Sequence, residues 1–208
     1  MSLENECIFI GFRLGNWSDQ YEQQQLSVEH NVKTIYLSAT RSPFIPWLFS
    51  TVAQYLSVLL VRIFRRSVLI NAMASNKRSL LLWSFVKANI RDVDLIIAHN
   101  IGTLYPAYKL SQHLNKPFHF DVEDFYPGEG VLRGQFNPGN NQEAFLMKNL
   151  LPFALRVTFA SQPIMDETLR LCDDIRRPLL INNCFSKIEF DAPSEVTPEK
   201  IQLVWYSQ

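Results

Sequence analysis

Three carboxylates stand within four residues at the end of one apolar run. Asp121, Glu123 and Asp124 lie at and just beyond the end of residues 117–122, whose sequence P-F-H-F-D-V predicts a β-strand. Carboxylates this close repel one another and invite a partner: a sugar hydroxyl, a metal ion, an arginine or a helix N-terminus. Side chains alternate along a strand, so we expect Asp121 and Glu123 on one side and Asp124 on the other. The cluster predicts a substrate site; alternatively, Asp124 caps a turn and Asp121 pairs with a basic residue.

Other polar residues stand at the ends of other predicted strands. His99 and Asn100 follow an apolar run over residues 94–98, and Ser161 follows one over residues 155–160. A histidine there can donate or accept a hydrogen bond near neutral pH. It can equally be a structural histidine that bonds a neighbouring loop. We therefore count all three as candidate substrate-binding residues.

Two glycines follow the first predicted strand. Gly11 and Gly15 form G-F-R-L-G, in which glycine would let the backbone approach a ligand closely. The spacing is not the dinucleotide fingerprint G-x-G-x-x-G, so no cofactor is predicted. Both glycines remain candidates for substrate binding, with a tight strand-to-helix turn as the alternative.

The elements that must position these residues alternate along the chain. Strands are predicted over residues 7–12, 33–38, 94–98, 117–122, 155–160 and 179–182, and helices over 17–30, 103–114 and 163–171. Such alternation predicts an α/β fold: a Rossmann-like parallel sheet with helices on both faces. Ligands bind such sheets beyond the carboxyl ends of the strands, which is where the candidate residues lie.

Composition narrows the functional classes. The 208 residues carry 20 basic and 20 acidic side chains, and no basic patch interleaved with aromatic residues indicates a nucleic-acid partner. The three cysteines are far apart, which excludes a disulfide framework and favours a reducing cytoplasm. Paired Cys/His spacing is missing, so no metal site is predicted.

Residues 44–63 form a long apolar stretch that could lie in the protein core or contact a membrane. This stretch has no charge until Arg62, and its length is close to the roughly 20 residues that span a bilayer. Ser50, Gln54 and Ser57 recur at helical spacing and form a narrow polar stripe, and basic residues follow. A buried or half-buried helix, a membrane-surface helix and a membrane span all remain open. Peripheral contact of residues 44–66 with anionic lipid at the inner face of a membrane is one expected partner interaction.

The C-terminal part changes composition. Residues 191–200 contain two prolines and four charges, which predicts a linker, and residues 201–208 read as a strand that opens a second domain. We therefore expect residues 1–190 to form one domain, followed by a truncated one.

Five segments in this order resemble the N-terminal domain of family-4-like retaining glycosyltransferases of the GT-B fold. They are D-L-I-I-A-H-N (94–100), F-D-V-E-D-F-Y-P-G-E (120–129), V-T-F-A-S-Q-P-I-M-D-E-T (157–168), L-L-I-N-N-C-F (179–185) and I-Q-L-V-W-Y-S-Q (201–208). The resemblance covers residues 93–208 by motif and the earlier part only by general pattern.

This resemblance implies a function and roles for particular residues. In the family the first domain binds the acceptor, the second binds the nucleotide-sugar donor, and transfer with retention occurs between them. The family's histidine that contacts the transferred sugar is replaced here by Glu123, and Asp124 takes the place of its acidic neighbour. These two are the expected catalytic residues. The acceptor is expected to be a saccharide or lipid-linked saccharide, as in polysaccharide biosynthesis. The donor-binding residues would lie after Gln208, so the chain alone is expected to be inactive.

Two other classes remain as alternatives. One is a non-catalytic α/β ligand-binding domain, similar to a flavodoxin or an epimerase. The other is a membrane-anchored scaffold built on residues 44–63.

Overall fold

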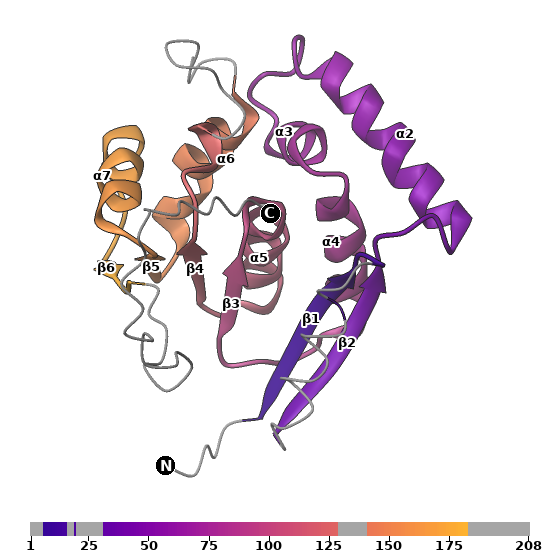
Figure 1. The fold of residues 1–208 in the computed structure, drawn as a ribbon, viewed down its shortest axis with the longest axis horizontal. Helices are drawn as coiled ribbons and strands as arrows, with labels where there is room; N and C mark the ends of the chain where they lie inside the picture. Colours follow the sequence, from indigo (N-terminus) through magenta and orange to yellow (C-terminus); the bar gives the residue numbers. More distant parts are fainter. Residues whose placement is uncertain (1–5, 16–18, 20–30, 129–140, 183–208) are drawn as a thin grey trace, which may run out of the picture.

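The computed structural model describes residues 6–15, 19, 31–128 and 141–182. Its strands form two parallel sheets (Figure 1). The first pairs β1 (Cys7–Arg13) with β2 (Val32–Ser38), and the second has the order β3 (Ile96–His99), β4 (Phe118–Val122), β5 (Arg156–Phe159), β6 (Pro178–Leu180). The predicted α/β class, with parallel sheets flanked by helices, is confirmed.

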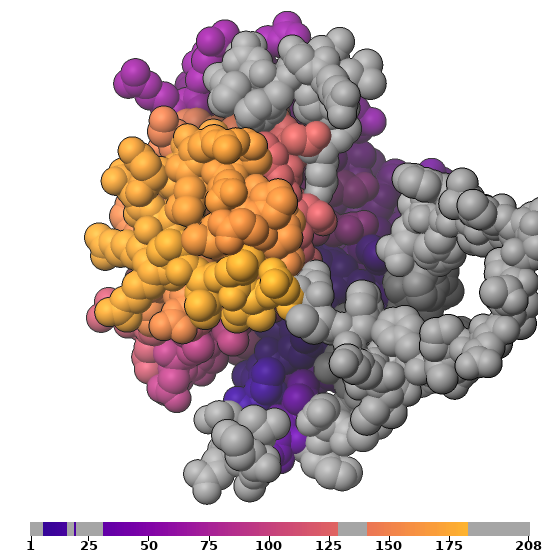
Figure 2. Space-filling model, turned by 60° about the vertical axis from the view of Figure 1, so that its left-hand side comes forward, coloured from indigo at the N-terminus to yellow at the C-terminus, as the bar shows by residue number. Residues whose placement is uncertain are grey.

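Helices fill the connections between the strands. They are α2 (Phe44–Leu60), α3 (Val68–Ser75), α4 (Arg78–Asn89), α5 (Ile101–Leu114), α6 (Gln142–Leu150) and α7 (Gln162–Leu171), with short 3-10 turns η1 (Tyr126–Gly128) and η3 (Leu151–Phe153). Figure 2 shows the region of α7 and β6, in orange to yellow, at the surface; β6 is an edge strand of the four-stranded sheet.

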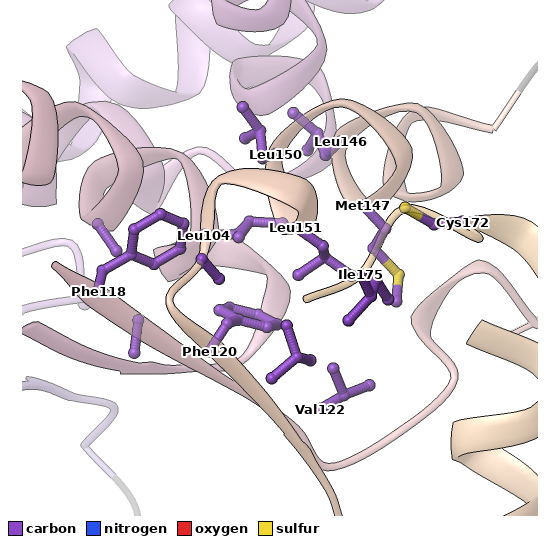
Figure 3. Close-up of a cluster of buried hydrophobic side chains, with 14 of the residues drawn as sticks. Leu104, Phe118, Phe120, Val122, Leu146, Met147, Leu150, Leu151, Cys172 and Ile175 are labelled. Atoms are coloured by element: carbon purple, nitrogen blue, oxygen red, sulfur yellow. The ribbon is translucent and has the colours of Figure 1, made fainter. Parts of the chain in front are cut away.

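One face of this sheet carries the main core. Phe118, Phe120 and Val122 of β4 are fully buried, whereas the residues between them are only half-buried. They pack with Leu104 of α5 and with Met147 of α6 (Figure 3). Burying each large apolar side chain stabilises the fold by about 1.5–3 kcal/mol. The alternation along β4 therefore fixes which face of the strand turns toward the helices.

The opposite face of the sheet remains accessible. Ile97, His119 and Arg156 are neighbours in register across β3, β4 and β5, and Ile97 is 61% exposed. His119 is half-buried there, and burial together with the charge of Arg156 lowers its pKa. The candidate residues His99 and Asp121 belong to this same face, one register row further along.

A second, smaller core joins the two sheets. Leu82 and Val86 of α4 are buried with Leu110 of α5, and Phe12 of β1 and Leu37 of β2 pack against them. The cluster formed by α4 and α5 thus contacts residues of both sheets, including Ile96 of β3.

Helix α2 packs with its polar side inward. Ser50 and Ser57 are its buried residues, and the Gln54 amide donates to the carbonyl of Ala74 in α3 at 3.4 Å. Most of its large apolar side chains are exposed to solvent. Among the described helices, none has the length and apolar character needed to cross a bilayer. Most residues of α2 are exposed, and the helix packs on the fold through its polar stripe.

The predicted elements within the described residues are all present, with bounds shifted by at most three residues. Helices α3, α4 and α6 were not predicted. The expected helix over residues 17–30 (apart from Asp19), the linker over 191–200 and the strand over 201–208 lie outside the described residues.

Candidate functional site

Three polar residues on neighbouring strands stand in one register row. His99 of β3 is paired with Asp121 of β4, and Asp121 is paired with Thr158 of β5. Parallel strands in register present the same face at each row, so the three side chains emerge side by side. The row lies toward the carboxyl ends of the strands, where α/β sheets bind ligands.

The side chains of this row are connected by hydrogen bonds. His99 Nδ1 lies 3.1 Å from Asp121 Oδ2 and 3.7 Å from Glu123 Oε1. The Thr158 hydroxyl donates to the other oxygen of Asp121. An ionised carboxylate can only accept, so Nδ1 carries the proton and Nε2 of the neutral ring is left with a lone pair. The chain Thr158–Asp121–His99 thus orients the imidazole, with Nε2 available as an acceptor.

The cluster is open to solvent. The side chains of His99, Asp121 and Glu123 are 56%, 27% and 48% exposed. His99 is the nitrogen partner that lies closest to both carboxylates among the described residues, at 3.1 and 3.7 Å. At the other end of these strands Lys116 pairs with Asp92 at 3.2 Å and Asp94 at 3.5 Å, and these carboxylates raise its pKa. Lysine therefore neutralises the acids at the amino edge, whereas no lysine or arginine forms an ion pair with Asp121 or Glu123 in the described part of the chain.

The same three residues have the donor types of a cation site. One ligand atom from each of His99, Asp121 and Glu123 lies within 4.8 Å of the others. One imidazole nitrogen and two carboxylate oxygens would suit a divalent transition ion. Asp121 is already engaged by Thr158 and His99, so binding an ion would require it to exchange these hydrogen bonds.

The residue after His99 shapes the start of α5. Asn100 has a φ of 69°, a region that non-glycine residues rarely adopt, and its side chain accepts a hydrogen bond from the Gly102 amide at 3.1 Å. The Thr103 hydroxyl donates to the carbonyls of His99 and Asn100. Asn100 thus caps α5, and Thr103 holds the carbonyl of His99; both have positioning roles.

Gly11 and Gly15 lie outside this cluster. Gly11 is inside β1, and a Cβ there would stand 2.8 Å from the Phe9 ring, so the glycine makes room for that side chain. Gly15 has a φ of +76°, and its amide and that of Leu14 donate to the Asp19 carboxylate at 2.8 and 3.0 Å. These hydrogen bonds lower the pKa of Asp19. The backbone donors of this turn are therefore occupied by the protein's own carboxylate.

The two remaining candidates stand near the sheet edge but apart from the cluster. Asp124 is exposed, and its carbonyl accepts from the Tyr126 amide as the chain turns into η1. Asp121 and Glu123 face His99 while Asp124 does not join them, as side-chain alternation predicts. Ser161 is the N-cap residue of α7 after β5, and its side chain makes no capping hydrogen bond.

In the sequence, His99 belongs to a different strand from the acidic cluster, and Thr158 carries no motif that marks it as a site residue. Strands far apart in sequence are neighbours in the sheet, so His99 directly contacts Asp121. Thr158 could have been noticed as a hydroxyl between two buried apolar residues, Val157 and Phe159.

No protein-family model matches this chain, and no curated protein matches its sequence.

Proposed function

We propose that this chain is the acceptor-binding domain of a retaining, sugar-nucleotide-dependent glycosyltransferase. The observation that carries the proposal is the convergence of His99, Asp121 and Glu123 at the carboxyl edge of a parallel sheet. The resemblance of the strand-end segments to family-4-like enzymes supports it. The acceptor is a saccharide or a lipid-linked saccharide, and the protein acts in the cytoplasm, at the inner face of the membrane when the acceptor is lipid-linked.

The chemistry of the cluster suits a polyhydroxylated ligand. Sugar hydroxyls are hydrogen-bond donors, and Nε2 of His99 and the carboxylate oxygens of Glu123 are exposed acceptors. Asp121 is the less exposed member, and its bonds to His99 and Thr158 orient the imidazole. In this proposal His99 and Asp121 bind the acceptor, Glu123 contacts the transferred sugar, and Asp124 completes the acidic edge.

The test is an assay of sugar transfer on the full gene product. The assay offers a panel of nucleotide-diphosphate sugars and saccharide acceptors. The double variant Glu123→Gln/Asp124→Asn should lower kcat/KM by about 100-fold or more, as expected when positioned acid–base groups are lost. Asp173→Asn/Asp174→Asn is the matched control, because it removes two exposed carboxylates elsewhere. Wild-type turnover by the first variant would remove the site assignment.

A divalent cation at the same three residues is the second candidate, favoured by their donor types and spacing. Titration with Mn²⁺ or Zn²⁺ separates the two proposals. Saturable binding that His99→Ala and Glu123→Gln both abolish would support the cation site, and unchanged binding by these variants would exclude it.

A further inference from the structure

Helix α2 has the reverse of the usual polarity of a surface helix. Its inward stripe includes Ser50, Gln54 and Ser57, whereas a surface helix of a globular protein normally turns its apolar stripe inward. The outward side is apolar along the whole helix, from Ile45 (79% exposed) to Leu59 (68% exposed). The outer face of α2 is defined by its exposed apolar and aromatic side chains: Phe44, Ile45, Leu48, Phe49, Val52, Tyr55, Leu56 and Leu59. A contiguous apolar surface of this size on a soluble domain marks an interaction site.

Inward packing of α2 is held by polar contacts that would not form in a displaced helix. Besides the Gln54 contact with α3, the Lys77 ammonium donates to the Thr51 hydroxyl at 3.4 Å. The Trp47 ring contacts two cations, with Arg41 5.4 Å and Lys77 5.5 Å from its centre. The orientation that exposes the apolar side is thus stabilised by several independent contacts.

Charge around α2 is of one sign. Between Glu29 and Asp92 the chain has nine Lys or Arg residues and no Asp or Glu, although the protein as a whole is neutral. Arg62, Arg65 and Arg66 follow the C-terminal end of α2 and are exposed, together with Ile63 and Phe64. Among the ion pairs of the described residues, none involves these three arginines.

A cavity lies beside this basic end. It has a volume of about 410 Å³ and is lined by Arg62 and Arg65, with Asn71 of α3 and the first turn of α6 on its other side. Two arginine residues in the lining of one cavity suit a phosphate ligand.

We propose that the outer face of α2 docks on an anionic lipid bilayer, with Arg62, Arg65 and Arg66 contacting phosphate headgroups. A helix with one apolar face, aromatic side chains and a basic flank lies in the plane of the membrane interface. The charge favours anionic lipid over a second copy of the chain. Arg41 and Lys77 lie beside Trp47 at the other end of α2, so a second α2 would bring cations together in either orientation. Five residues separate the end of β2 at Ser38 from the start of α2 at Phe44. The inference does not depend on the proposed glycosyl transfer.

Flotation with lipid vesicles tests this proposal. The chain should float with vesicles of phosphatidylcholine mixed with phosphatidylglycerol, and much less with phosphatidylcholine alone. High salt should weaken the binding, because exposed charges are screened. Equal binding to both vesicle types, or no binding to either, would overturn the proposal.

Two sets of variants locate the binding surface. Arg62→Gln/Arg65→Gln/Arg66→Gln should weaken binding to the mixed vesicles on the order of 100-fold, from the contribution of each basic residue near an anionic surface. Ile45→Ser/Phe49→Ser/Leu59→Ser should abolish flotation. The matched controls are Lys148→Gln/Arg170→Gln/Arg176→Gln and Ile181→Ser, all at exposed positions remote in sequence from α2.

Folding and oligomeric state complete the test. The side chains of the variants are exposed, so circular dichroism and Tm should match the wild type; if the apolar variant fails to fold, the arginine variant decides alone. Suppose that light scattering shows that the wild type is a dimer and the apolar variant a monomer, and that neither binds vesicles. In that case the outer face of α2 is an interface between two copies of the chain, and the lipid proposal is wrong. Vesicle binding by the control variants that falls as far as that of the α2 variants would also overturn it.

Discussion

At the scale of single residues, the candidate site depends on three polar side chains in one register row. His99 contributes an imidazole whose Nδ1 is engaged by Asp121, and Thr158 holds the second oxygen of Asp121. Each contact crosses from one strand to the next, so the row exists only when β3, β4 and β5 are paired in this register. The chemistry of the cluster is therefore a property of the sheet rather than of one sequence motif.

Asn100 provides a stability test at the strand–helix junction. Alanine removes the capping side chain and retains the unfavourable positive φ, so Asn100→Ala should lower the free energy of unfolding by about 1–3 kcal/mol. Glycine tolerates this backbone conformation, and Asn100→Gly should cost much less. Urea unfolding measures both; equal losses would mean that φ does not contribute.

His119 makes the stability pH-dependent. Its pKa in the folded protein is lowered, first by burial and then by Arg156, so the unfolded state binds more protons at mildly acidic pH. The neutral His119 ring leaves the free energy of unfolding at its full value above the unfolded-state pKa of about 6.5. The free energy of unfolding then decreases as the pH falls through this value and below it. His119→Gln should flatten the fall in unfolding free energy from pH 7.5 to pH 5.5 (about one unit either side of that pKa). An unchanged slope, with His113→Gln as the comparison, would contradict this.

At the scale of elements, the start of α5 is locked against the turn between α3 and α4. The Ser79 hydroxyl donates to the carbonyl of Gly102 at 2.7 Å, and the Asn76 side chain accepts from the Arg78 amide at 2.9 Å. A Cβ on Gly102 would stand 2.6 Å from Asn76 Nδ2. Only glycine at position 102 leaves Asn76 in place.

A double-mutant cycle tests this close approach. Gly102→Ala should destabilise the fold by about 1–3 kcal/mol, as overpacking does. In an Asn76→Ala background the same change should cost less by about 1 kcal/mol, because the clashing amide is gone. If the losses of unfolding free energy in thermal or urea unfolding are additive, the clash with the Asn76 amide is not the reason that Gly102→Ala destabilises the fold.

The elements also show how far the sequence could predict the structure. The strands were recognisable because apolar runs such as residues 94–98 and 155–160 are bounded by polar residues, and α5 because its apolar residues recur at helical spacing. Helices α3, α4 and α6 were missed: in the first two, apolar residues are distributed around the helix, and α6 is short and polar at its start. The inverted packing of α2 was not predictable from its own pattern, since the choice of inward face depends on the polar groups of α3 and Lys77.

The same limit applies to the candidate site. Strand ends could be predicted, and with them Asp121, Glu123 and His99 as candidates. Which of them meet depends on strand order and register, which the sequence pattern does not contain. Gly11 and Gly15 show the converse, because a glycine motif of plausible spacing is used for packing and for an internal hydrogen bond to Asp19.

At the scale of the whole molecule, two surfaces have opposite character. The carboxyl edge of the four-stranded sheet is acidic and rich in hydrogen-bond acceptors, whereas α2 and its basic end are apolar and positively charged. If both proposals hold, the domain would rest on an anionic bilayer while its acidic edge binds a saccharide acceptor. The total charge of the chain is zero because the acidic and basic residues balance.

The most direct measurement of the central claim is the ¹H–¹⁵N spectrum of the histidine rings of the chain during titration with saccharide acceptors, including a lipid-linked saccharide. The free protein should show His99 with its proton on Nδ1, as the bond to Asp121 requires. Addition of a bound acceptor should shift the Nε2 signal of His99 and leave His113 unchanged, and Asp121→Asn should weaken that acceptor's binding. A saccharide that binds without moving the His99 signal, or a chain that binds no saccharide at all, would contradict the account.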